Sequence, residues 1–393
     1  MAERRIYADN AATTAVSDAA LSAMLPYFKE CYGNPSATHS FGTEAKRGLE
    51  EARSTVARAL GARVNEIYFT SGGTESDNWA LYAAAELRKK KGSHIVITEI
   101  EHSAVYRTAK EMEKKGFDIT FLPVDREGHV TPEQLEDAIR DNTVLVSIMM
   151  ANNEIGTILP IRELCAVARK RGVLFHTDAV QAAGHIPVDA VGLGVDMLSV
   201  SGHKFGGPKG VGALYVNLRT VVPPMIIGGG QEKGRRSGTS NVPGAVGMAA
   251  ALEDAVLHMG ENAQKIAILR DRLISGVLQL PQAELTGDPV HRLPGLASFV
   301  FSGVEGEVLV SLLNEAGICV SSGSACSAGS GEPSRVLKAA GYDGTSASAA
   351  IRFSLSENNT SDDVTYILAQ LPFILEKAKT IKFTARDLDF DGD

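Results

Sequence analysis

The 393-residue sequence has few cysteines, no long apolar run and no excess of positive charge, and each absence excludes a class of protein. Its four cysteines, Cys31, Cys165, Cys319 and Cys326, form no C-x-x-C pair, so neither a metal site nor a disulfide framework is predicted. No apolar stretch approaches the roughly 20 residues that cross a bilayer, and the first residues contain no signal-peptide core. The net charge is −8 and no long basic tract is present, which argues against a nucleic-acid partner. We therefore expect a cytoplasmic protein with reduced thiols and no membrane or nucleic-acid partner.

Helical and strand patterns alternate along the first two thirds of the chain. Strands are predicted at 66–70, 94–98, 144–150, 173–179 and 197–201, and helices at 43–60, 74–91 and 160–171. This βαβ succession predicts an α/β fold with a mainly parallel sheet that is buried on both faces.

From about residue 242 a long helical stretch leads into a smaller α+β unit, and the chain is too long for a single core. We expect a large domain of residues 14–255 and a small domain formed by residues 1–13 and 256–393.

Polar or glycine residues follow the predicted strands, where the ligands of open α/β sheets bind. This set consists of Ser71, Gly72, Gly73, Thr74, His102, Asn152, Asn153, Asp178, Gln181, Ser201, His203 and Lys204. Their joint placement predicts one site at the carboxyl edge of the sheet.

Five members of this set also have an ordinary structural interpretation. Gly73 and Thr74 start a helix and fit a phosphate-binding turn or a plain N-cap. Asp178 fits a protonated pyridine nitrogen or an internal ion pair, and Lys204 fits a Schiff-base lysine or a structural lysine. His102 fits a residue stacked on a flat ring or a helix cap.

Two residues of the last third add to this picture. Arg352, in the strand-like AIRFSLS, predicts either a bidentate contact with a substrate carboxylate or an internal salt bridge. Cys326 lies among Ser, Gly and Ala, where nothing would bury it, so an exposed and reactive thiol is predicted. Cys165 and Cys319 fit buried small hydrophobic positions.

These residues occur in segments that resemble a known family, the cysteine desulfurases of the NifS/IscS type, within the fold-type I, class V aminotransferase-like enzymes that use pyridoxal 5'-phosphate. The resemblance runs from YADNAATT to AIRFSLS. Its most specific segments are FTSGGTESDNWAL, EHSAV, NNEIG, HTDAVQ, SGHKFGGPKGVGALY, RSGT and SSGSACS.

The resemblance implies a role for each matching position. Lys204 would bind the cofactor covalently, Asp178 its pyridine nitrogen and Gln181 its phenolic oxygen, and His102 would stack on the ring and act in acid–base steps. The phosphate ligands would be Gly73, Thr74, Ser201, His203 and, from a neighbouring subunit, Thr239. Asn153 and Arg352 would hold the carboxylate of L-cysteine with Asn34 nearby, and Cys326 would form the persulfide.

The same resemblance implies a homodimer that passes sulfur to an acceptor protein such as an iron–sulfur scaffold. The terminal EKAKTIKFTARDLDFDGD departs from the terminus that housekeeping members offer to this scaffold, so the acceptor stays open. Two other functions also remain: an aminotransferase or selenocysteine lyase on the same fold, and a cofactor-free thiol enzyme or redox sensor. The latter would leave Lys204 and Asp178 unexplained.

Overall fold

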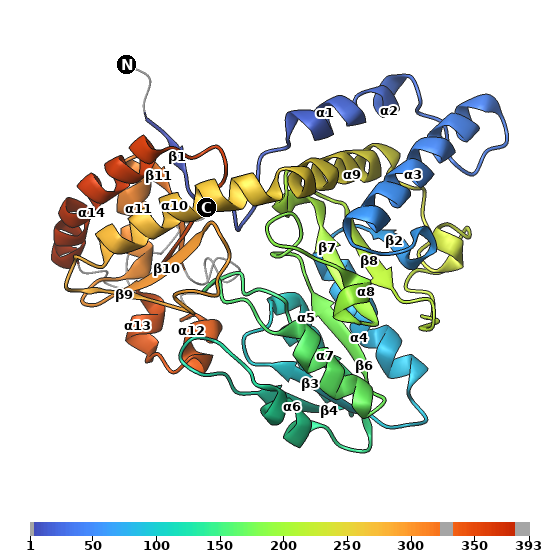
Figure 1. Ribbon diagram of the computed structural model, residues 1–393, viewed down its shortest axis with the longest axis horizontal. Helices are drawn as coiled ribbons and strands as arrows, with labels where there is room; N and C mark the ends of the chain where they lie inside the picture. The colour runs from blue at the N-terminus through green and yellow to red at the C-terminus, as the bar shows by residue number, and fades with distance from the viewer. Residues whose placement is uncertain (1–3, 323–332, 382–393) are drawn as a thin grey trace, which may run out of the picture.

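A computed structural model describes residues 4–322 and 333–381, and its largest feature is a seven-stranded sheet in the order β2-β8-β7-β6-β5-β3-β4 (Figure 1). Strands β3 to β7 pair in parallel, whereas β8 pairs antiparallel with both β7 and β2. The strands are β2 (Ile67–Thr70), β3 (His94–Thr98), β4 (Asp118–Leu122), β5 (Thr143–Ser147), β6 (Leu174–Asp178), β7 (Met197–Ser201) and β8 (Gly212–Val216). The predicted α/β fold with a mainly parallel sheet is confirmed.

Helices cover both faces of this sheet because its central strands are apolar on both sides. Ile95 and Ile97 of β3 pack in one core cluster with Trp79 of α4, whereas Val96 between them packs in another with Leu164 of α7. The helices of this region are α1 (Asp18–Met24), α2 (Pro26–Lys29), α3 (Ser40–Ala59), α4 (Gly73–Leu87), α5 (Ser103–Lys114), α6 (Pro132–Ala138), α7 (Ile161–Lys170), α8 (Ala190–Leu193) and α9 (Val242–Leu257). Short 3₁₀ turns are η1 (Val64–Glu66), η2 (Gly202–Lys204) and η3 (Glu232–Gly234).

A second, antiparallel sheet has the order β12-β13-β10-β9 and its own core cluster, which includes Phe299 and Phe353. The strands are β9 (Ala283–Leu285), β10 (Leu296–Phe301), β12 (Ser321–Ser322) and β13 (Ala350–Ser354). Its helices are α10 (Met259–Val277), α11 (Gly306–Glu315), α12 (Arg335–Ala339), α13 (Gly344–Ser348) and α14 (Ser361–Thr380). Beside it, β1 (Ile6–Tyr7) pairs in parallel with β11 (Ile318–Cys319), so the start of the chain lies against its last third.

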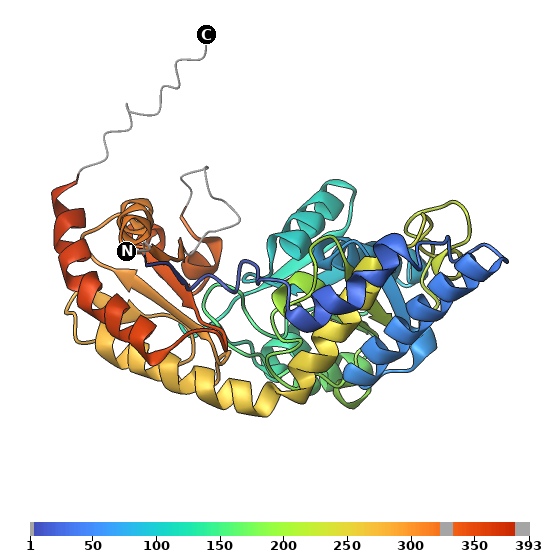
Figure 2. The ribbon, with the colours of Figure 1, turned by 90° about the horizontal axis from the view of Figure 1, so that it is seen from above.

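The long helical stretch predicted from residue 242 is divided at His258 into α9 and α10. Figure 2 shows these two helices running from the first sheet to the second along one side of the molecule. We propose the domain division at residues 14 and 255 because the second sheet has a separate core. Some residues beyond 255, among them Leu296 and Leu337, nevertheless pack in the core of the first sheet. Within the described ranges, no helix has both the length and the apolar character that a membrane span requires.

Candidate active site

The carboxyl ends of the central strands bring most of the predicted site residues to one edge of the sheet. Asp178 is the last residue of β6 and Ser201 the last of β7, and Lys204 follows in the η2 turn. His102 caps the helix after β3, and Gly73 begins the helix after β2. Parallel strands end at the same edge, which is why residues so far apart in sequence meet.

The turn between β2 and α4 resembles an anion-binding helix N-terminus. Gly72 has φ +152°, which favours glycine, and it precedes the first turn of α4, where amide groups lack helical partners. A Cβ atom added at Gly73 would lie 2.7 Å from Cγ2 of Val180 and 3.6 Å from Cβ of Ser201. Only glycine therefore lets the α4 terminus approach the ends of β6 and β7 this closely, and this fit supports a phosphate site.

The amine of Lys204 is held by the amino-terminal segment of the chain. Its Nζ donates hydrogen bonds to the carbonyl oxygens of Ala11, at 2.7 Å, and Ala12, at 2.9 Å. Gln181 Nε2 donates to the same Ala11 oxygen at 2.9 Å. His203 Nδ1 lies 3.1 Å from the hydroxyl of Thr13, and burial is the main reason that the pKa of His203 falls to about 4. Residues 11–13 thus orient three of the predicted cofactor ligands.

His102 and Asp178 form an electrostatically linked pair. Nδ1 of His102 accepts a hydrogen bond from the backbone N–H of Ala104 at 3.2 Å, so the neutral ring carries its proton on Nε2. Burial lowers the pKa of His102, although Asp178 opposes this shift. Burial also raises the pKa of Asp178, and the nearby His102 and Lys204 counteract it. Asp178 accepts a backbone bond from Val180 at 2.8 Å, which fixes its carboxylate.

Arg352 has a partner in the chain and unused hydrogen-bonding capacity as well. Its Nη2 donates to Asp9 Oδ1 at 2.9 Å and its Nη1 to the carbonyl oxygen of Asn153 at 2.7 Å. The guanidinium Nε and the side-chain Oδ1 of Asn153 are both buried without a hydrogen-bond partner among the described residues. The internal salt bridge therefore exists, and the Nε donor of Arg352 remains beside it as a group suited to a ligand carboxylate.

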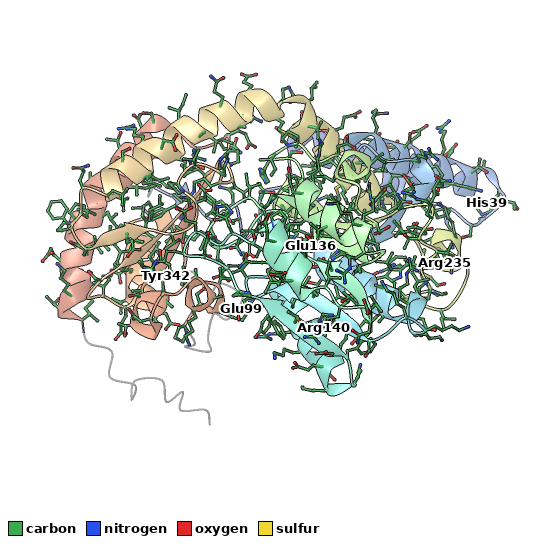
Figure 3. The ribbon with its side chains drawn as sticks, turned by 60° about the horizontal axis from the view of Figure 1, so that its bottom comes forward. His39, Glu99, Glu136, Arg140, Arg235 and Tyr342 are labelled. Atoms are coloured by element: carbon green, nitrogen blue, oxygen red, sulfur yellow. The ribbon has the colours of Figure 1, made fainter. Side chains whose placement is uncertain are left out.

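Two predicted residues lie apart from this group. Asn34 is exposed in the loop between α2 and α3, where its Oδ1 accepts from the Ser36 backbone at 3.0 Å. Thr239 is exposed in the loop between η3 and α9. Figure 3 shows His39 and Arg235, which belong to these two loops, together at the end of the molecule opposite Tyr342. Cys326 lies outside the described residues.

The loop that carries Thr239 is fastened by buried charges. Arg53 of α3 pairs with Glu232 through two hydrogen bonds of 2.6 and 2.8 Å, and both side chains are almost fully buried. Glu232 also accepts from the Phe69 backbone at 3.0 Å, and Arg53 donates to the Ile67 carbonyl at 3.0 Å. The loop is thus tied to β2, the strand that leads into the Gly73 turn.

The sequence reasoning missed several buried polar residues around the site. Asp77 on α4 and Glu101 before His102 are fully buried, and burial raises the pKa of Glu101 to about 8. Arg335 of α12 hydrogen-bonds the backbone oxygens of Glu99 and Glu101 and lies over the ring of Tyr106. The available signal was the position of Asp77 two residues before the apolar run WALYAAA of the same predicted helix.

Comparison with known proteins agrees with this geometry. The class-V aminotransferase family matches residues 6–367. Curated relatives named cysteine desulfurase IscS include one from Methanosarcina thermophila, 48% identical over 96% of this chain and 94% of the relative, and one from Dictyoglomus turgidum, 48% identical over 96% of each. Solved structures that resemble it include a NifS-like protein, with a TM-score of 0.90 and 43% identity over 95% of this chain and all of that one. Another is SspA in complex with cysteine, with a TM-score of 0.79 and 35% identity over 90% and 99% of the two chains. The chain belongs to the class-V aminotransferase family and, within it, to the cysteine desulfurases of the NifS/IscS type.

Proposed function

We propose that this chain is a pyridoxal 5'-phosphate-dependent cysteine desulfurase, which converts L-cysteine to L-alanine and keeps the sulfur as a persulfide on Cys326. The observation that carries the proposal is the convergence of a lysine, a buried carboxylate and a neutral histidine at one sheet edge. Lys204 and His102 both act on the charge of Asp178, beside a glycine turn suited to phosphate.

The residues present fit the cofactor. Gly73, Thr74, Ser201 and His203 would hold its phosphate, Asp178 its pyridine nitrogen, Gln181 its phenolic oxygen and Lys204 its aldehyde carbon. The bound cofactor supplies an electron sink for the bonds of the substrate α-carbon.

Lys204 would act twice, first as the covalent holder of the cofactor. Once free, its amine would take the α-proton of the substrate. The bonds to Ala11 and Ala12 keep this amine directed to one side of the η2 turn. His102, neutral and protonated on Nε2, would donate that proton and take one back at the same nitrogen afterwards.

Arg352 and Asn153 would place the substrate by its carboxylate. The sulfur step then belongs to Cys326. Its thiolate would attack the substrate sulfur, the Cβ–S bond would break, and Cβ would receive a proton to leave alanine. The enzyme thiol and the substrate thiol together become one persulfide, so atoms and electrons balance.

The assembly and the acceptor complete the proposal. A homodimer would let Thr239 reach the phosphate of the neighbouring subunit, and two-fold dimers are the commonest oligomers. The acceptor of the persulfide would be a protein such as an iron–sulfur scaffold.

Borohydride reduction of the purified protein tests the proposal. We expect a yellow protein in which reduction fixes pyridoxal phosphate to the peptide that contains Lys204, and in which added L-cysteine yields alanine and protein-bound sulfur. Lys204→Ala should lose both the fixed cofactor and alanine release. A colourless wild-type protein would favour a thiol enzyme without cofactor, and keto-acid formation in place of alanine would favour an aminotransferase.

A further inference from the structure

A second buried carboxyl group lies next to Asp178. Asp77, on α4, is 1% exposed, and its carboxylate, that of Asp178 and a ring nitrogen of His102 offer atoms that all lie within 4.8 Å of one another. Oδ1 of Asp77 has no hydrogen-bond partner in the described part of the chain. The proposed mechanism does not use this group.

The other neighbours of Asp77 are neutral. Its Oδ1 lies 3.7 Å from Nε2 of His176, but both ring nitrogens of that histidine pair with hydroxyls, Ser147 at 2.8 Å and Ser199 at 2.9 Å. Burial lowers the pKa of His176 to about 3, so the ring carries no charge at neutral pH. The neutral hydroxyl of Ser199 lowers the pKa of Asp77 and partly offsets the effect of burial. Among the residues that the structure describes, this surrounding supplies polar contacts and no positive charge.

Two buried carboxyl groups this close cannot both ionise at low cost. Asp178 is the carboxyl group that ionises more readily, because His102 and Lys204 both lower its pKa and the backbone N–H of Val180 donates a hydrogen bond to its carboxylate. Burial, Asp178 and Glu101 all raise the pKa of Asp77. The proton of the pair therefore belongs on Asp77.

We propose that Asp77 is a positioning residue that stays a neutral carboxylic acid beside Asp178 and leaves one negative charge, on Asp178, for the cofactor's pyridine nitrogen. The part of this role that concerns the nitrogen rests on the proposed function. A second anion would oppose the ionisation of Asp178, whereas a neutral acid fills the same space and supplies both a donor and an acceptor.

Infrared spectroscopy of the cofactor-free protein tests the protonation directly. With ¹³C-labelled aspartate, we expect an isotope-shifted carbonyl band of a protonated acid at neutral pH. The band should persist in Glu101→Gln, which removes a different buried carboxyl group near the site, and disappear in Asp77→Asn. Asp77→Ala carries the same expectation and keeps the test decisive if the Asn variant does not fold. Absence of an aspartate band in the wild type, or its survival without Asp77, would overturn the inference.

The role toward the cofactor is tested with ¹⁵N-labelled pyridoxal phosphate. Asp77→Asn preserves size and neutrality, so the ring-nitrogen chemical shift should match the wild type and the dissociation constant should change by less than about twofold. If Asp77 were ionised, the same substitution would remove a like charge and alter the ionisation of Asp178, with an effect of about tenfold. Asp178→Asn is the control that should lose the protonated-nitrogen signal.

The inference about Asp77 and the proposed function can fail independently of each other. A band assigned to Asp77 in a protein that never binds pyridoxal phosphate would sink the proposed function and leave the neutral acid standing. A yellow, active protein without the band would overturn the inference about Asp77 and leave the proposed function standing.

Discussion

Arg352 allows a quantitative test of how the substrate is held, because the structure separates its internal partner from its unused nitrogen. Asp9 takes Nη2 at 2.9 Å, and the Asn153 carbonyl takes Nη1 at 2.7 Å. Lysine lacks the planar fork, so Arg352→Lys keeps the charge and loses the directed contacts. A hydrogen bond to a charged group contributes about 1.5–3 kcal/mol, and every 1.4 kcal/mol is about tenfold. We therefore expect KM for cysteine to rise about 10- to 150-fold with bound cofactor unchanged.

Asp9→Asn is the matched control. It weakens the salt bridge and leaves the guanidinium in place, so the free energy of unfolding should fall by about 1–3 kcal/mol while KM stays within about threefold. Steady-state kinetics with alanine detection and urea denaturation measure the two effects. An unchanged KM in Arg352→Lys, or an equal rise in Asp9→Asn, would show that the arginine serves packing alone.

Further predictions concern the thiol, the pH dependence and the Thr239 loop. Cys326→Ser should keep the yellow cofactor and lose the protein-bound sulfur seen by mass spectrometry after cysteine addition, and sulfur on another cysteine would contradict the assignment. The pKa of Glu101 is about 8 in the folded protein, above the ordinary value of 4.5, so its stabilising contribution is complete in acid and is lost as the pH rises from 4.5 toward 8. The unfolding free energy of the cofactor-free protein should therefore decline between these two pH values. The decline should be smaller in Glu101→Gln. Glu232→Gln removes the buried partner of Arg53 and leaves it the half-exposed Glu50 as carboxylate partner, so it should cost about 1–3 kcal/mol and weaken the proposed dimer by sedimentation. Glu253→Gln, in an exposed pair with Arg58, should cost under about 1 kcal/mol, and equal losses would contradict the role of the Arg53–Glu232 pair in fixing the loop.

The strands that the sequence predicts well are those buried on both faces. β3 and β7 match their predicted ranges at 94–98 and 197–201, because all five residues of each strand are buried. β4 escaped prediction because it is an edge strand, more exposed and less apolar. β8 was not predicted as a strand and occurs only within the motif SGHKFGGPKGVGALY. No local sequence feature indicates that it pairs antiparallel with both of its neighbours.

The site shows the same division between local and long-range signals. The sequence shows directly that Lys204 and Asp178 each come at or just after the end of a strand. The order of the strands in the sheet then brings the two residues together. Contacts such as Lys204 with Ala11 and Ala12, or Arg53 with Glu232, join segments that are remote in sequence and involve backbone oxygens or buried charges. No spacing rule reveals such partners, which is why they were found only in the folded chain.

The anchoring of the amino terminus has a consequence for the order of events during synthesis. Ile6 of β1 pairs with Ile318 of β11, and the carbonyls that hold Lys204 follow a few residues after β1. The ribosome makes this segment first, yet its partner strand emerges only when most of the chain is complete. Contacts of such sequence separation form late in folding. The first sheet can therefore assemble on the nascent chain while Lys204 still lacks its restraints, and we expect stable cofactor capture only after β11 has been made.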